Sequence, residues 1–141
     1  MIYYKEGYKY QLAKTYTIQV GIAPIAGDSY SIMHLSLTRT GMLLIEKGYA
    51  WDGASGPTFD TCTSMRGSLV HDALYQLIRI GAVDENERRR VDEIFMKICI
   101  EDGMWAWRAK LWFHGVRLFA AYAARKDNEP KVLTAPGGAN G

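Results

Sequence analysis

The chain has 141 residues, of which 48% are hydrophobic and 23% charged, a composition that excludes disordered and fibrous classes and suffices for one domain with its own core. Its formal net charge of +2 is too small to predict a nucleic-acid-binding surface, and no run of Lys and Arg is interleaved with aromatic residues. We therefore expect a single soluble domain that does not bind nucleic acid.

Cysteine content and the N-terminal sequence bear on where the chain is made. Cys62 and Cys99 permit at most one internal disulfide and do not form the C-x-x-C spacing of a metal site. The N-terminal sequence lacks the apolar segment and cleavage site of a secretory signal, and no apolar run reaches the roughly 20 residues of a membrane-spanning helix. We expect synthesis in a reducing cytoplasm without a signal peptide.

The first third of the chain predicts antiparallel strands, because it is rich in Tyr, Thr, Ile and Val and is divided by Gly and Pro residues. The predicted strands cover residues 16–22, 30–38 and 42–47. Alternation in 30–38 places Met33, Leu35 and Leu37 on the buried face. His34 falls on the polar face, where we expect an exposed or hydrogen-bonded side chain rather than a ligand.

Residues 48–63 have neither helical nor strand periodicity, so we expect the sheet to end there and a loop to begin. Within this segment, Gly53, Gly56 and Pro57 supply backbone freedom and a stop. The loop leads directly into helical periodicity.

Three helices are predicted after the loop. The first covers residues 66–80 and ends before Gly81, a suitable C-terminal cap. The second begins near Asp84 or Asn86, either of which can cap its N-terminus. The third covers residues 105–126.

The third helix carries an apolar stripe that we interpret as core rather than as a membrane-facing surface. The stripe consists of Trp105, Trp112, Val116, Phe119 and Ala123. Basic residues keep the membrane-facing option open; they are Arg108, Lys110, Arg117, Arg125 and Lys126.

These elements together predict an α+β fold, in which an N-terminal antiparallel sheet is followed by a three-helix segment with an antiparallel helix pair. The domain is expected to cover residues 1–126. Residues 127–141 are rich in Pro, Gly, Ala and Asn, which predicts a flexible C-terminal tail.

A cluster of reactive residues is predicted where the first two helices face each other. His71 and Tyr75 are four positions apart and share a helix face, while Asp72 lies about 100° around the axis from His71. Asp92 follows His71 by 21 positions, on a helix joined by a short turn, so the two residues can lie level and touch.

This pattern is typical of general-base catalysis. A carboxylate that holds a histidine fixes its tautomer and stabilises its imidazolium form, as a general base near neutral pH requires. We expect the base to activate water, because Ser68 and Cys62 are not placed as obvious nucleophiles.

Asp72 is a candidate ligand for a hard cation, with carbonyl oxygens of the preceding glycine loop as further ligands. Calcium fits this mixture better than zinc, because one histidine is local and no thiolate pair is near. A structural role is the other interpretation, in which Asp72 forms a salt bridge with Arg66 or Arg79. Both interpretations stay open.

The chain resembles a family of phage and prophage proteins that contain a domain of unknown function. The resemblance rests on G-Y-x-W-D-G-A-S-G-P at residues 48–57, H-D-x-L-Y at 71–75 and R-x-x-D-x-x-F at 89–95, and continues weakly over 108–119. These motifs cover about half of the chain. They imply a viral origin and name no activity.

More distantly, the same motifs resemble the His-Asp core of the calcium-dependent secretory phospholipase A2 family, in which a glycine-rich loop precedes an H-D-x-x-Y helix. This resemblance implies that His71 is the general base, that Asp92 orients it and that Tyr75 hydrogen-bonds Asp92. It also implies a calcium site at Asp72, with Asp52 and the backbone of Gly53 beside it. The cysteines that normally surround the histidine in that family are replaced by Leu and Val here.

Two functions are therefore expected. The first is a phospholipase A2-like hydrolase that cleaves an ester in a lipid or another envelope component. The second is a non-enzymatic virion or accessory protein whose loop and third helix dock on other subunits. Expected partners are phage structural proteins, the host envelope or a lipid surface, after synthesis in the host cytoplasm, with incorporation into the virion as an option.

Overall fold

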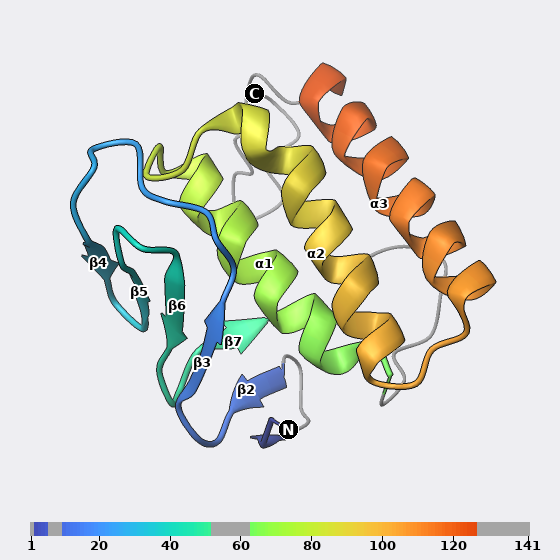
Figure 1. The fold of residues 1–141 in the computed structure, drawn as a ribbon, viewed down its shortest axis with the longest axis horizontal. Helices are drawn as coiled ribbons and strands as arrows, with labels where there is room; N and C mark the ends of the chain where they lie inside the picture. The colour runs from blue at the N-terminus through green and yellow to red at the C-terminus, as the bar shows by residue number, and fades with distance from the viewer. Residues whose placement is uncertain (1, 6–9, 52–62, 127–141) are drawn as a thin grey trace, which may run out of the picture.

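The computed structural model describes residues 2–5, 10–51 and 63–126 (Figure 1). Within these ranges, the surroundings of the side chains are described for all residues except 4, 5 and 119–126. Two small antiparallel sheets precede three helices in the chain. The predicted α+β class and the order of sheet before helices are thus confirmed.

The larger sheet has four antiparallel strands in the order β3-β6-β5-β4. Their bounds are β3 Tyr16–Gln19, β4 Tyr30–Ile32, β5 Leu35–Leu37 and β6 Met42–Ile45. Side chains on one face of β5 and β6 are fully buried, which makes this face the sheet's contribution to the core. Each strand is shorter than the segment predicted for it.

The prediction of one strand over 30–38 was wrong, because β4 and β5 form a hairpin with Met33 and His34 as its turn. Ile32 pairs with Leu35, and His34 adopts a left-handed φ of +67°. Met33 is 82% exposed rather than buried. The ring of His34 instead packs near Gly48, and its buried Nδ1 has no hydrogen-bond partner, contrary to expectation.

A second sheet, in the order β1-β2-β7, was not predicted. It consists of β1 Tyr4–Lys5, β2 Tyr10–Leu12 and β7 Ala50–Trp51. β7 lies in the segment that was expected to be loop from residue 48 onward. A strand of two residues is too short to produce a period of its own, so sequence alternation could not reveal it.

The helices lie close to their predicted positions. They are α1 Met65–Arg79, α2 Arg88–Glu101 and α3 Ala106–Lys126, with a short 3-10 helix, η1 Glu85–Glu87, before α2. Gly81 ends α1 in a left-handed conformation, with φ of +84°, as its predicted capping role requires. Asp84 caps η1 by accepting a hydrogen bond of 2.8 Å from the backbone N–H of Asn86.

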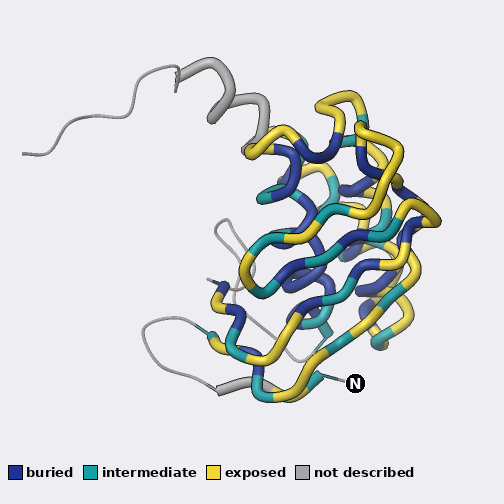
Figure 2. Tube along the Cα trace, turned by 90° about the vertical axis from the view of Figure 1, so that its left-hand side faces the viewer, coloured by how far each residue is buried: buried dark blue, intermediate teal, exposed yellow. Residues whose placement is uncertain are grey.

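The elements form layers in which the four-stranded sheet packs on α1, and α2 lies between α1 and α3 (Figure 1). One core joins sheet residues such as Leu35 and Leu43 to Leu69 and Leu74 of α1. A second apolar cluster joins α2 to α3. Figure 2 shows buried and exposed residues alternating along strands and helices, so each element has an inner side.

The predicted core stripe of α3 is correct only in part. Trp112 and Val116 are buried, together with Ala109, against α2. Trp105 is 71% exposed, because it precedes the first helical residue and does not follow the helical phase. The side chains of Phe119 and Ala123 lie outside the described residues.

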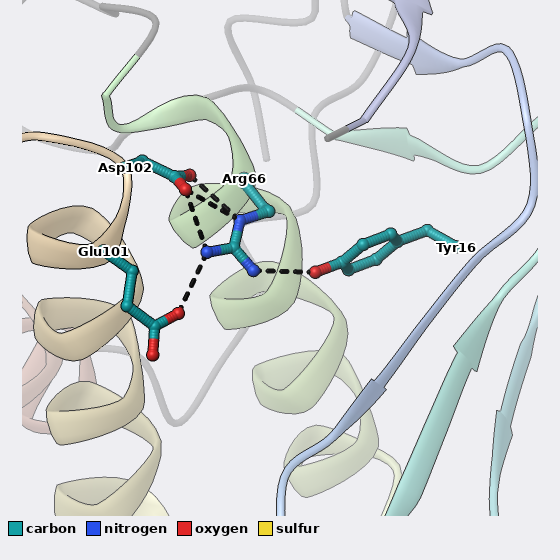
Figure 3. A network of polar contacts seen from close by, with 4 residues as sticks. All are labelled: Tyr16, Arg66, Glu101 and Asp102. Atoms are coloured by element: carbon teal, nitrogen blue, oxygen red, sulfur yellow. Dashed lines mark hydrogen bonds and ion pairs between the residues drawn. The ribbon is translucent and has the colours of Figure 1, made fainter.

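Arg66 connects three elements (Figure 3). Its guanidinium binds both carboxylate oxygens of Asp102, donates to Glu101 at the end of α2, and donates to the Tyr16 hydroxyl of β3. The hydrogen bond to Asp102 outweighs partial burial and raises the pKa of Arg66 above its usual range. The start of α1 is thereby fixed to α2 and to the larger sheet.

Among the described residues, no helix is both long and apolar enough to cross a membrane.

Candidate functional site

The candidate site forms where α1 and α2 approach closely. At Gly67 an added Cβ would lie 2.9 Å from Cys99 Sγ and 3.1 Å from a ring carbon of Phe95, so the helices can meet at this distance only because a side chain is missing. One turn further along α1, His71 faces α2. Its Nε2 lies 2.7 Å from Asp92 Oδ1.

Asp92, on α2, is fully buried and is surrounded by donors from the two other helices, α1 and α3. Its Oδ1 lies 2.7 Å from His71 Nε2 and accepts a 2.7 Å hydrogen bond from the Tyr75 hydroxyl. Its Oδ2 accepts a 3.2 Å hydrogen bond from Arg117 Nη1. A buried carboxylate without such partners would be strongly unfavourable. The arrangement therefore accommodates a negative charge in the interior.

Arg117 is a site residue that sequence reasoning missed. It was counted only among the basic residues of the third helix, although it follows the buried Val116 and so borders the face of α3 that packs on α2. Its place in the sequence could predict a contact with Asp92 only if the packing of α3 on α2 were already known. In the structure, Arg117 links α3 to the candidate site, and its side chain remains 39% exposed.

The His71 ring packs against two aromatic rings. The ring centroid of Tyr75 lies 4.2 Å away and that of Phe95 lies 5.3 Å away, and His71 is only 9% exposed. With Nε2 directed at Asp92, the other ring nitrogen, Nδ1, faces Asp72 at 3.9 Å. In neutral His71 the Nε2–H donates to Asp92, so Nδ1 carries the lone pair that can accept a proton.

Opposing effects act on the pKa of His71. Burial, the largest effect, lowers the pKa, but the carboxylates of Asp72 and Asp92 together outweigh it and raise the pKa above its ordinary value of 6.5. The imidazolium form is thus favoured by two acids. For Tyr75, burial and the neighbouring Asp92 both raise the pKa of the phenol, which keeps the hydroxyl protonated.

Asp72 does not form the salt bridge with Arg66 that was one interpretation of its role, because Arg66 binds Asp102 and Glu101. Its carboxylate oxygen Oδ1 instead lies 3.9 Å from His71 Nδ1, and 27% of the Asp72 side chain is exposed. Within the described residues, no group of three or more His, Cys, Asp or Glu side chains could hold a metal ion. The predicted ligands Asp52 and Gly53 lie outside the described residues.

Trp51, which lies within the segment predicted as a loop, is hydrogen-bonded to α1. Trp51 is 3% exposed, and its indole Nε1 donates a 3.0 Å hydrogen bond to Ser68 Oγ, one turn before His71. Ser68 in turn donates to the carbonyl of Met65. Strand β7 is therefore bonded to the helix that carries His71.

Cys99, the cysteine within the described residues, is not a nucleophile for this site. Cys99 is a free, buried thiol, and burial together with the charge of Asp102 raises its pKa to about 12. A thiol with so high a pKa is not a nucleophile at neutral pH. Cys62, the other cysteine, lies outside the described residues.

Fold and site together define an α+β protein in which a His, a Tyr and an Arg from two helices surround one buried Asp on a third. A family model described as "Protein of unknown function (DUF1353)" matches residues 32–116, more than half of the chain, and the chain belongs to this family. The matched range contains His71, Asp72, Tyr75 and Asp92. Comparison with curated proteins and with solved structures gives no match.

Proposed function

We propose that the chain is a phage protein that hydrolyses an ester by activating water at His71. The observation that carries the proposal is the 2.7 Å contact between His71 Nε2 and the buried Asp92, which leaves Nδ1 as the proton acceptor. An exposed histidine without this contact would have neither a fixed tautomer nor a stabilised imidazolium.

In the proposed reaction, Nδ1 of His71 accepts a proton from a water molecule while the water oxygen bonds to the ester carbonyl carbon. The resulting tetrahedral intermediate then breaks its bond to the ester oxygen, and the leaving alkoxide takes the proton back from Nδ1. Asp92 stabilises the imidazolium between these steps. Asp72, 3.9 Å from Nδ1, is close enough for one water to contact both groups.

Tyr75 and Arg117 act through Asp92 in this proposal. Both donate to its carboxylate, Tyr75 to Oδ1 and Arg117 to Oδ2. They therefore orient Asp92, which in turn orients His71. We therefore assign them a positioning role rather than a direct part in the reaction. The high pKa of the Tyr75 phenol supports a lasting donor role, because the group does not ionise near neutral pH.

The proposal includes an optional calcium ion that Asp72 would bind, with Asp52 and the backbone of Gly53 as further oxygen ligands. The described residues supply only one part-exposed carboxylate for it, which is fewer ligands than calcium takes. No step above depends on the ion. Hydrolysis measured with added calcium and with a chelator decides whether the ion contributes.

The proposed substrate is an ester of a lipid or of another component of the host envelope. The resemblance to the His-Asp core of secretory phospholipases supports this substrate class, and the motifs shared with phage and prophage proteins support the viral origin. We propose synthesis in the host cytoplasm, followed by action on the envelope or incorporation into the virion. Phage structural proteins or the envelope are then the partners.

The test is hydrolysis of a soluble chromogenic ester and of dispersed phospholipid by His71→Gln and Asp92→Asn. We expect a loss of about 10²- to 10⁴-fold for each, the range typical of a general base and its orienting acid. Glu93→Gln is the matched control, because Glu93 neighbours Asp92 but pairs with Arg89 on the surface. Equal rates for all variants, or no turnover by the unaltered chain, would refute the proposal.

A non-enzymatic virion or accessory protein is the second candidate, and the burial of His71 favours it. A histidine that is 9% exposed, with a raised pKa and two neighbouring acids, also suits a structural ion pair that joins α1 to α2. This candidate predicts that phage carrying Asp72→Asn remain viable, and that truncation after Asp127 impairs assembly. Loss of viability in Asp72→Asn with a normal melting temperature would favour the hydrolase instead.

A further inference from the structure

Helix α3 has apolar residues on two opposite faces. The inner face is formed by Ala109, Trp112 and Val116, which pack on α2. At 100° per residue, Trp107 and Leu111 project from the opposite side, as does Leu118, two turns beyond Leu111. A helix that needed only one contact to the domain would be polar on this outer face.

The apolar residues of the outer face are exposed. Trp107 is 59% exposed, Leu111 is 61% exposed and Leu118 is 72% exposed. The exposed Trp105 extends this surface beyond the start of the helix, with its ring centroid 6.1 Å from that of Trp107. Single exposed apolar residues are ordinary, but four large ones in one stripe indicate an interaction surface.

The charge around this face has one sign. The sequence of α3, Ala106–Lys126, contains five Lys or Arg residues and no Asp or Glu. Among those whose side chains are described, Lys110 is exposed beside Leu111, whereas Arg117 is bound to Asp92. The two acids that precede Trp105, Glu101 and Asp102, are both bound by Arg66. The outer face is thus apolar at its centre and positive at its edge.

A second copy of the chain is a poor occupant for such a face, because pairing α3 with α3 would place two acid-free basic helices side by side. An anionic lipid surface matches both properties. Exposed Trp rings bury their apolar part at the level of the lipid head groups, and Lys and Arg extend toward the negative charges. We propose that the outer face of α3, formed by Trp105, Trp107, Leu111 and Leu118, docks in the plane of an anionic bilayer surface.

This inference is independent of the chemistry at His71, and it is tested by co-sedimentation of the full-length chain with lipid vesicles. We expect binding to mixed phosphatidylglycerol and phosphatidylcholine vesicles and at least about tenfold weaker binding to pure phosphatidylcholine. Replacing Trp107→Ser and Leu111→Ser together is expected to weaken binding more than tenfold, because both substitutions remove apolar surface that would be buried in the bilayer.

The matched control is the double variant Ile25→Ser and Met33→Ser, which removes two apolar side chains of the strand region that are at least as exposed as Trp107. Its binding is expected to be unchanged. Far-UV circular dichroism verifies that each variant is folded. The proposal is overturned by an absence of binding to anionic vesicles, by equal loss in the control variant, or by a dimer that Leu111→Ser converts to a monomer.

Discussion

His71 and Asp92 come from different helices, yet Nε2 of one lies 2.7 Å from Oδ1 of the other, and the carboxylate has no exposed surface. Water therefore cannot replace any donor that Asp92 loses. The stability of the helix pair and the proposed activity both depend on the donors around this one acid.

We expect Asp92→Ala to lower the free energy of unfolding by about 3–5 kcal/mol, because it leaves partners of a buried ion pair without their acid. Glu93→Ala, one position along, is expected to change it by less than about 0.5 kcal/mol, because its pair with Arg89 is on the surface. Urea unfolding followed by circular dichroism measures both. Similar losses for the two variants would show that Asp92 is not structurally important.

The raised pKa of His71 predicts opposite pH dependences for stability and for hydrolysis. Asp72, Asp92, Tyr75 and Arg117 face the ring or its acid, and the two carboxylates favour its protonated form. The stability that His71 contributes is therefore full below about pH 6.5 and is lost as the pH rises through its higher folded-state pKa. Hydrolysis should increase over the same range, because a general base must be neutral.

The measurement is the difference in unfolding free energy between the unaltered chain and His71→Gln at several pH values, in the presence of a chelator. We expect this difference to shrink as the pH is raised from about 6 to 9. A difference that grows with pH would mean that neutral His71 is the stabilised form. Ester hydrolysis by the unaltered chain over the same pH values provides the independent comparison.

The contact at Gly67 predicts that a single methyl group will separate α1 from α2. Gly67→Ala would place its Cβ 2.9 Å from Cys99 Sγ, and we expect a loss of about 1–3 kcal/mol in unfolding free energy from overpacking. Gly115→Ala is the control, because nothing lies within 4 Å of its added Cβ in the middle of α3. It should gain about 0.5–1 kcal/mol from helix propensity.

Arg66→Lys tests whether the fork geometry of the guanidinium matters beyond its charge. A lysine cannot bind Asp102 through two nitrogens while also donating to Tyr16 and Glu101, so we expect a loss of about 1–3 kcal/mol in unfolding free energy. Arg89→Lys, whose side chain is 72% exposed, should change the unfolding free energy by less than about 0.5 kcal/mol. Thermal unfolding of the two variants compares them directly.

The helices were predictable from the sequence because each is long enough for its period to repeat. Gly81 and Asp84 marked the turn between the first two helices. The short length of this turn was enough to predict that His71 and Asp92 can lie opposite each other on the two helices. The catalytic roles of these residues, by contrast, stay predictions, since geometry alone does not measure turnover.

The remaining features depend on contacts that no local pattern contains. The β4–β5 turn at Met33 and His34 lacks Gly, Asn or Pro, so alternation continued through it and concealed the hairpin. Arg117 reaches Asp92 only because α3 packs on α2, a tertiary relationship. Trp105 was assigned to the core because the helical phase was extended one residue too far.

Helix α3 presents Trp107 to the outside and Arg117 to the buried acid. A helix with its side chains is only about 10–12 Å across, so whatever binds the exterior of α3 sits one helix thickness from the carboxylate that holds the imidazole. Any tilting or sliding of α3 on α2 would be transmitted to Asp92 through the guanidinium of Arg117.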